Sequence, residues 1–337
     1  MDTKDTANTI PPEVEQIFRT AMEQHEYDVQ VSDEIEKLLR THEFDELPAD
    51  EQEDKLEKLA FAYYYRGIWP LHKNFVDSER FLKESSKLWH ELLERQPFCD
   101  DEEKNARRRL RLAGVCREFV KLYIEFNCTG RIIQAERYAL EALLYYGDRE
   151  KYLRGKVCSE FASYAVMRKD CERAEKFYRM AVRYYHESEG ADTPEVRRLI
   201  AEQFMGIASM YKMTIQNGKA LEYYRSALHT LLDISEVTDI DYWKALGDCA
   251  YETAGILQWL GNDDEAERYY KQAIGAYYTA CERFDDPLIV YDCIASARNA
   301  LADLYDQKGR GEGGLRTDSD TVAREVRRMK KKKSNAE

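Results

Sequence analysis

The segment AERYYKQA, residues 266–273, is the most informative stretch of this chain, because its pattern recurs elsewhere without gaps. Full copies are AERYALEA at 135–142, AEKFYRMA at 174–181 and ALEYYRSA at 220–227, and a degenerate copy, SERFLKES, stands at 78–85. Each full copy begins and ends with Ala and carries an aromatic or small residue four positions after its start. On a helix these positions share one face, where Ala lets a partner helix approach and the larger residue fills the gap beside it.

A second helical pattern precedes each full copy at a constant offset. Twelve residues before each copy stands one of Tyr123, Ala162, Ala208 and Ala254, and a last such pattern at Ala302 is followed by Gly309. Expected turn residues separate the two patterns: Gly130, Lys169-Asp170, Asn217-Gly218 and Gly261-Asn262-Asp263. Gly and Asn tolerate the left-handed backbone that ends a helix, and Asp can cap the next one.

The starts of successive copies lie 57, 39, 46 and 46 residues apart. A single helix pair of this kind leaves an apolar stripe exposed, which only the next pair can cover. The low content of 16 Gly and 7 Pro also excludes a β-sandwich or barrel, which needs a turn every 8–12 residues or so. The sequence therefore predicts an all-α fold, an α-solenoid of antiparallel helix pairs.

The pattern resembles the tetratricopeptide repeat (TPR), in a variant with long helices. The consensus is matched best by Ala254, Leu257, Gly261, Ala266, Tyr270 and Ala273. The 46-residue spacing exceeds the family's usual 34 or so, and the consensus Pro after the second helix is absent. The resemblance covers residues 55–310 and implies a right-handed superhelix. The long repeats are more similar to those of peptide-sensing regulators and motor-adaptor proteins than to those of chaperone adaptors.

Charge divides the chain into three regions. Residues 1–54 are predicted to be an acidic N-terminal arm with one or two helices, the first beginning at Pro11-Pro12 and running to about Arg40. Residues 55–310 form the TPR-like solenoid of about five to six helix pairs. Residues 311–337 form a Gly-rich hinge and a basic C-terminal tail with a short helix at 321–333. Most of the net charge of −13 comes from the strongly acidic arm, and the tail is basic, so acidic and basic residues are close to balanced within the solenoid.

The net charge of −13 argues against a general nucleic-acid binder. No apolar run approaches the ~20 residues that span a bilayer, and residues 1–20 contain no signal-like apolar region. The eight Cys residues are never closer than twelve positions apart, which is typical of reduced core residues. We therefore expect a cytoplasmic protein without a transmembrane segment.

No motif indicates catalysis, a cofactor or a metal. The segment GRGEGG at 309–314 satisfies G-x-G-x-x-G, but a helix precedes it where the dinucleotide motif needs a strand, so a hinge is favoured. None of the six His residues lies three or four positions from another. The run Arg107-Arg108-Arg109-Leu110-Arg111 is interpreted as a charged helix surface, with an anion or phosphopeptide patch as the alternative. For the basic tail we consider a solvated helix, an anionic membrane surface, nucleic acid, or docking on the acidic arm.

The leading hypothesis for function is a scaffold, not an enzyme, that binds a protein or peptide in the concave groove of the solenoid. The resemblance implies groove positions on the first helix of each pair: Ser159, Ser163, Val166, Met205, Ser209, Lys212, Tyr251, Gly255, Gln258, Asn299, Asp303 and Asp306. The mixed polar lining suggests a peptide without a strongly acidic end. The alternative is a peptide-sensing regulator whose N-terminal arm moves on ligand binding. Self-association through the solenoid ends is a further expectation.

Overall fold

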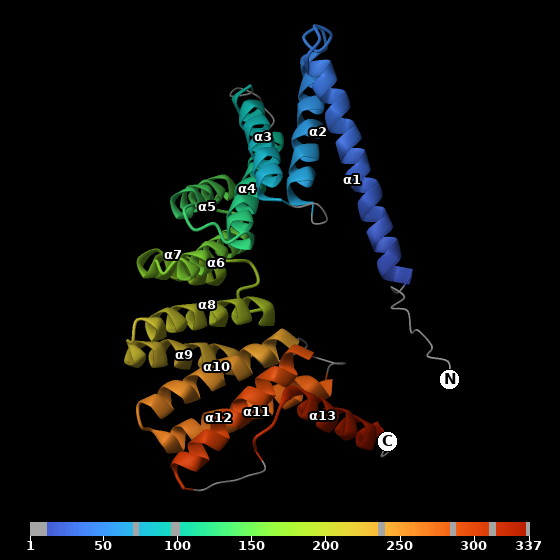
Figure 1. The fold of residues 1–337 in the computed structure, drawn as a ribbon. Coiled ribbons are helices and arrows are strands. Elements are labelled where there is room, and N and C mark those ends of the chain that lie inside the picture. Colours follow the sequence, from blue (N-terminus) through green and yellow to red (C-terminus); the bar gives the residue numbers. More distant parts are fainter. Residues whose placement is uncertain are drawn as a thin grey trace, which may run out of the picture. The chain divides into compact units, whose positions relative to one another are not determined.

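The computed structural model describes residues 12–69, 74–95, 102–234, 240–283, 288–309 and 315–334. These residues form thirteen α-helices (Figure 1). The helices are α1 (Pro12–Leu39), α2 (Ala49–Ile68), α3 (Phe75–Glu94), α4 (Glu102–Glu125), α5 (Ile132–Tyr146), α6 (Lys151–Met167), α7 (Cys171–His186), α8 (Pro194–Met213), α9 (Asn217–Leu232), α10 (Ile240–Trp259), α11 (Asp263–Arg283), α12 (Leu288–Gln307) and α13 (Ser319–Ser334). Within the described ranges, no helix has both the length and the apolar character that a membrane crossing requires.

The chain forms two compact units, residues 1–150 and 151–337. In the first unit α1 packs on α2, and α2 with α3 and α4 with α5 form pairs. In the second unit the pairs are α6 with α7, α8 with α9, α10 with α11, and α12 with α13. Sequential antiparallel pairs of this kind confirm the predicted all-α, TPR-like solenoid. The right-handed superhelix and the division into arm, solenoid and hinge with tail stay predictions.

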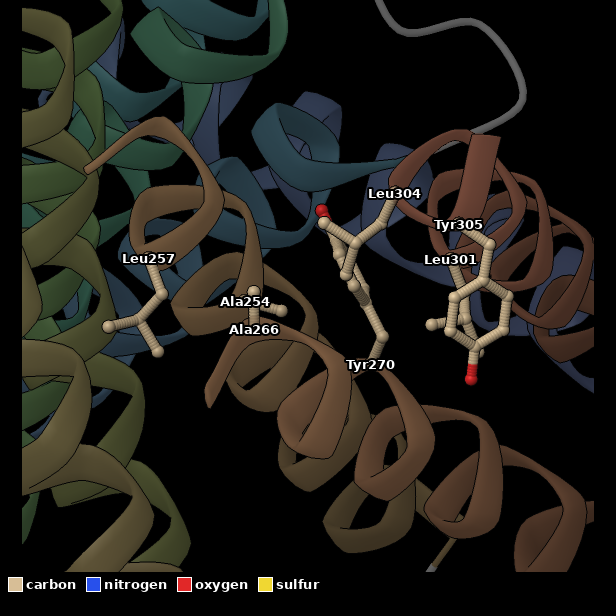
Figure 2. Packing of buried hydrophobic residues seen from close by; sticks show 7 residues of the cluster. All are labelled: Ala254, Leu257, Ala266, Tyr270, Leu301, Leu304 and Tyr305. Atoms are coloured by element: carbon tan, nitrogen blue, oxygen red, sulfur yellow. The ribbon is translucent and has the colours of Figure 1, made fainter. Parts of the chain in front are cut away.

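The alanines of the repeated pattern lie at the contacts between helices. Ala208 and Ala254 of the first helices and Ala174, Ala220 and Ala266 of the second helices are all 0% exposed. Figure 2 shows how one pair is covered by the next: Leu301, Leu304 and Tyr305 of α12 belong to the same buried cluster as Ala254, Leu257, Ala266 and Tyr270 of α10 and α11. The apolar stripe that each pair leaves open is therefore buried by its neighbour, as the sequence predicts.

The first helix of successive pairs ends in the same backbone motif. A residue with positive φ stands two positions after the last helical residue: Asn127, Lys169, Ile215, Gly261 and Gly309. In the α8 and α10 copies the next N–H reaches back five residues, from Gln216 to the Tyr211 carbonyl and from Asn262 to the Leu257 carbonyl, both at 2.9 Å. This is the Schellman arrangement, which satisfies the carbonyls at the end of a helix.

Two expected turn positions differ from the structure. Asn127, rather than Gly130, has the left-handed backbone after α4. After α8 this backbone belongs to Ile215, while Asn217 and Gly218 already lie in the first turn of α9. Because α8 ends at Met213, the position two residues later falls on Ile215 rather than on a Gly. Residues 1–11 of the predicted arm and residues 310–314 of the predicted hinge lie outside the described residues.

The basic C-terminal segment packs on the last helices of the second unit. Val322 and Val326 of α13 are buried. Glu325 also forms a 2.8 Å ion pair with Arg298 of α12. One face of this segment is therefore covered by the protein, which differs from the solvated helix that the sequence suggests. Residues Val322 and Val326 are four positions apart, so a single apolar stripe holds the helix in place.

Candidate functional site

One groove in the second unit crosses three first helices in succession. We call it the acidic groove; its volume is about 540 Å³. Met205, Gly206 and Ser209 come from α8, Asp248, Tyr251 and Glu252 from α10, and Asp292, Cys293 and Ser296 from α12, with Tyr224 of α9 and Tyr277 of α11 behind them.

The groove runs obliquely across these helices. On α8 it begins at Met205, three residues before Ala208, whereas on α10 it begins at Asp248, six residues before Ala254. On α12 it begins at Asp292, ten residues before Ala302. The lining therefore shifts by about one helical turn from each first helix to the next, because packed helices cross at an angle.

A glycine and a tyrosine form part of the groove wall. A Cβ atom added at Gly247 of α10 would lie 2.3 Å from the ring of Tyr277, so only Gly allows this ring to lie there. The Tyr277 hydroxyl then donates a 2.7 Å hydrogen bond to Oδ1 of Asp248. Burial, followed by the neighbouring charge of Asp248, raises the pKa of Tyr277, so this hydroxyl remains a protonated donor.

Three carboxylates face the groove. Asp248 is bound by Lys244 at 2.5 Å, and Glu252 by Lys212 at 2.5 Å. Asp292 accepts a hydrogen bond from the Ser319 hydroxyl. Burial is the largest single effect on Lys244 and lowers its pKa, but the hydrogen bond to Asp248 and the neighbouring negative charges together exceed it, so the pKa is raised. Three acids with two ammonium groups leave the groove with an excess of negative charge.

The remaining side chains of the groove are suited to binding. Burial, reinforced by the charge of Asp248, raises the pKa of Cys293, so its sulfur stays a thiol and not the nucleophilic thiolate. Burial likewise raises the pKa of Tyr251. Within the described ranges, no group of three or more His, Cys, Asp or Glu residues is placed to hold a metal ion. The site therefore offers neutral hydroxyls, carboxylates and the thioether of Met205 to a ligand.

The structure brings together three of the site residues expected from the sequence. Met205, Ser209 and Tyr251 all line the acidic groove. Lys212 lies on the same face of α8 and reaches it through its ion pair with Glu252. Gln258 lies elsewhere, since it accepts a 2.9 Å hydrogen bond from the Tyr270 hydroxyl and donates one of 3.1 Å to Gln307.

The other expected residues also lie outside this groove. On α6, the Ser163 hydroxyl donates to the carbonyl of Ser159 at 3.0 Å. On α12, Asn299 holds the backbone of Thr317 with two hydrogen bonds, of 3.0 and 2.9 Å. Asp303 forms a 2.7 Å ion pair with Arg316. On α12, the face predicted for a partner is thus occupied by the chain's own segment before α13.

The groove carboxylates are not among the residues that the repeat pattern predicts for the site. Asp248 and Glu252 are four residues apart and flank Tyr251 on one face of α10, which is a signal that the sequence contains. Asp292 has no such signal, because it lies far from the small residue that marks its repeat. The predicted site positions were all taken at the same distance from the small residue of each repeat, whereas the residues that line an oblique groove lie at a different distance in each repeat.

Comparisons with known proteins bear on the fold. No family model and no curated protein matches the chain. Among solved structures, BtubC (BKLC) from P. vanneervenii has a TM-score of 0.51 at 14% identity, over 78% of this chain and 93% of that one. Aspartyl phosphate phosphatase F from Bacillus subtilis has a TM-score of 0.50 at 15% identity, over 95% of this chain and 85% of that one. With its paired helices and buried alanines, this chain is a helical repeat protein with a TPR-like fold.

Proposed function

We propose that the acidic groove binds a peptide or a segment of a partner protein that carries a Lys or Arg side chain. The TPR-like fold is typical of protein and peptide binding. The preference for a basic ligand rests on one observation. Asp248, Glu252 and Asp292 lie along one groove whose other walls include Met205 and Tyr251. Carboxylates recognise a cationic side chain, and the apolar walls accommodate its neighbours.

The dimensions of the groove suit a short extended segment. Two successive steps of about 10 Å between packed helices separate α8 from α12, so a ligand that reaches across spans about 20 Å. An extended chain covers this distance with roughly six residues at about 3.3 Å each. The proposed function is binding rather than catalysis, which agrees with a thiol at Cys293 whose pKa is raised by burial.

A selection experiment tests this proposal. A random peptide library displayed on phage is selected against the full chain, and the affinity of one enriched peptide is measured by fluorescence anisotropy. We expect enriched peptides to carry Lys or Arg. The change Ser209→Trp fills the groove and should weaken binding at least about tenfold, or about 1.4 kcal/mol.

The matched control is Ser226→Trp, at an exposed position of α9 that does not line the groove. It should leave the affinity within about twofold, which is under 0.5 kcal/mol. Equal affinities of the Ser209 variant and the unchanged chain, or enrichment of acidic peptides, would contradict the proposal.

A second hypothesis is that the N-terminal arm moves when a peptide binds. The contact of α1 with α2 is rich in polar groups, which favours a separable contact: Arg66 donates to the Ser32 hydroxyl at 2.6 Å, and the Tyr63 hydroxyl donates to Glu36 at 2.7 Å. Small-angle X-ray scattering of the full chain with and without the selected peptide tests this idea. A change in the radius of gyration supports movement, and identical profiles contradict it.

A further inference from the structure

A basic pocket lies in the first unit, between α2, α3 and α4. Its volume is about 300 Å³. The α4 side of the pocket consists of Lys104, Arg107, Arg108 and Arg111, and the opposite side of Glu57, Phe61 and Trp89. Three of these four cations come from the Arg-rich run at 107–111, which the proposed function does not use.

The inner wall of the basic pocket is held by buried ion pairs. Arg108 is 2% exposed and its Nε donates to Glu57 at 2.7 Å, while Nη2 donates to Glu53 at 2.8 Å. Its Nη1 donates to the carbonyl of Leu92 at 3.1 Å, and Lys104 donates to Glu53 at 2.7 Å. Both carboxylates are therefore engaged by inner cations, and the wall is rigid.

The outer cations are differently placed. Arg107 and Arg111 are exposed, stand four residues apart on α4, and form no ion pair with another residue of the described ranges. The guanidinium of Arg111 lies 5.0 Å from the centre of the Phe61 ring, and that ring meets Trp89 edge-on at 5.1 Å. Stacking on Phe61 restricts the Arg111 side chain, so less conformational entropy is lost when Arg111 binds an anion.

We propose that the basic pocket binds a phosphate monoester carried by a side chain of a partner protein. Four cations and the two carboxylates Glu53 and Glu57 leave an excess of about two positive charges, which matches the charge of a phosphate monoester near neutral pH. Two guanidinium groups on successive turns can each form paired hydrogen bonds with phosphate oxygens. Phe61 provides an apolar surface beside the phosphate.

The size of the pocket and the charge of the chain favour a single phosphorylated side chain over a nucleic acid. A volume of about 300 Å³ is at the lower end for ligand pockets. The chain as a whole carries a charge of −13, which repels an extended polyanion. A single phosphate group on a peptide is small enough to interact with the positive charge of the basic pocket alone.

The test titrates the full chain with phenyl phosphate by isothermal calorimetry, with benzoate and inorganic phosphate for comparison. We expect saturable binding of phenyl phosphate, at least tenfold tighter than that of benzoate and tighter than that of inorganic phosphate. The changes Arg107→Gln and Arg111→Gln should each weaken it at least tenfold. Arg108 is left unchanged, because its loss would remove a partner from the buried Glu53 and from Glu57.

The control is Arg109→Gln, an exposed residue of the same helix that does not line the pocket. It should bind phenyl phosphate as the unchanged chain does, and thermal melts should show all three variants folded. The proposal is overturned by an absence of saturable binding at millimolar phenyl phosphate, by an equal loss in the Arg109 variant, or by inorganic phosphate binding as tightly. A short single-stranded RNA that binds this pocket more tightly than phenyl phosphate would overturn it as well.

Discussion

The ring of Tyr277 occupies the space that a side chain at position 247 would need, and its hydroxyl is bonded to Asp248, the next residue along α10. The absence of a Cβ on Gly247 thus allows α11 to place a ring against the groove. The same Tyr277 ring therefore packs α11 against α10 and forms part of the wall of the acidic groove.

The substitution Gly247→Ala should therefore destabilise the protein. In an exposed helix Gly→Ala stabilises by up to about 1 kcal/mol, but here the methyl group would meet the Tyr277 ring and overpack the contact. We expect a loss of about 1–3 kcal/mol in the free energy of unfolding, measured with urea. The control Gly275→Ala, an exposed position of α11 with no neighbour within 4 Å, should show the usual gain. A gain at both positions would refute the close contact.

Ile215 is a β-branched residue with a φ of 59°, which is an unfavourable backbone for its type. Its side chain is 76% exposed, so little packing is lost when it is removed. The change Ile215→Gly should raise the free energy of unfolding by about 1 kcal/mol, despite the greater freedom of Gly in the unfolded chain. Gly261→Ala, at the equivalent position after α10, should lower it by a similar amount. Urea titrations measure the change in the free energy of unfolding for each variant, and the two changes should have opposite signs.

Ala220 tests the packing of the repeat. It is fully buried in α9, so Ala220→Leu should overpack the crossing of two helices and cost about 1–3 kcal/mol. Glu222→Leu, at an exposed position of the same helix, is the control and should change stability by less than about 0.5 kcal/mol. Thermal melts followed by circular dichroism compare the two, and an unchanged melting temperature for the Ala220 variant would exclude a helix crossing at this position.

Glu267 gives the stability a pH dependence at low pH. Its hydrogen bond from Lys271 is the main cause that lowers its pKa to about 2, against the opposing effect of burial and with a further bond from the Tyr305 hydroxyl. Because the pKa is lowered on folding, the stabilisation is present above the ordinary value of 4.5 and is lost as the pH falls toward about 2.

The variant Glu267→Gln should be less stable than the unchanged chain at neutral pH, and the difference should shrink across this acidic range. Urea titrations at several pH values measure it, with Glu222→Gln as the control for an exposed carboxylate. A difference that does not depend on pH would mean that the charge of Glu267 contributes nothing.

Most of the fold follows from the periodicity of the sequence. Ala220 and Ala266 mark helix contacts because only small residues fit there, and that requirement is local and repeated. The turn after α8 was misplaced because no residue type signals that Ile215 has a left-handed backbone. There the contacts of the whole helix outweigh the preference of one residue.

The acidic groove could be predicted only in part. Met205, Ser209 and Tyr251 were found because they lie near the small residues that mark their repeats. The sequence does not predict Asp292, because the groove shifts by about two helical turns between α8 and α12 relative to those markers. Likewise, the sequence shows the Arg-rich run of α4 but not that Phe61 and Trp89 face it across a pocket.

The class of the fold, the helix pairs and the residues at their closest contacts can be predicted from the sequence, because they depend on side-chain size at short, regular spacings. Which polar residues share a surface depends on the three-dimensional arrangement of the helices. The crossing angle of each pair adds to that of the pair before it, so the residues that line the groove shift along the helix axis from one first helix to the next. A pattern read at constant offset does not contain that accumulated shift.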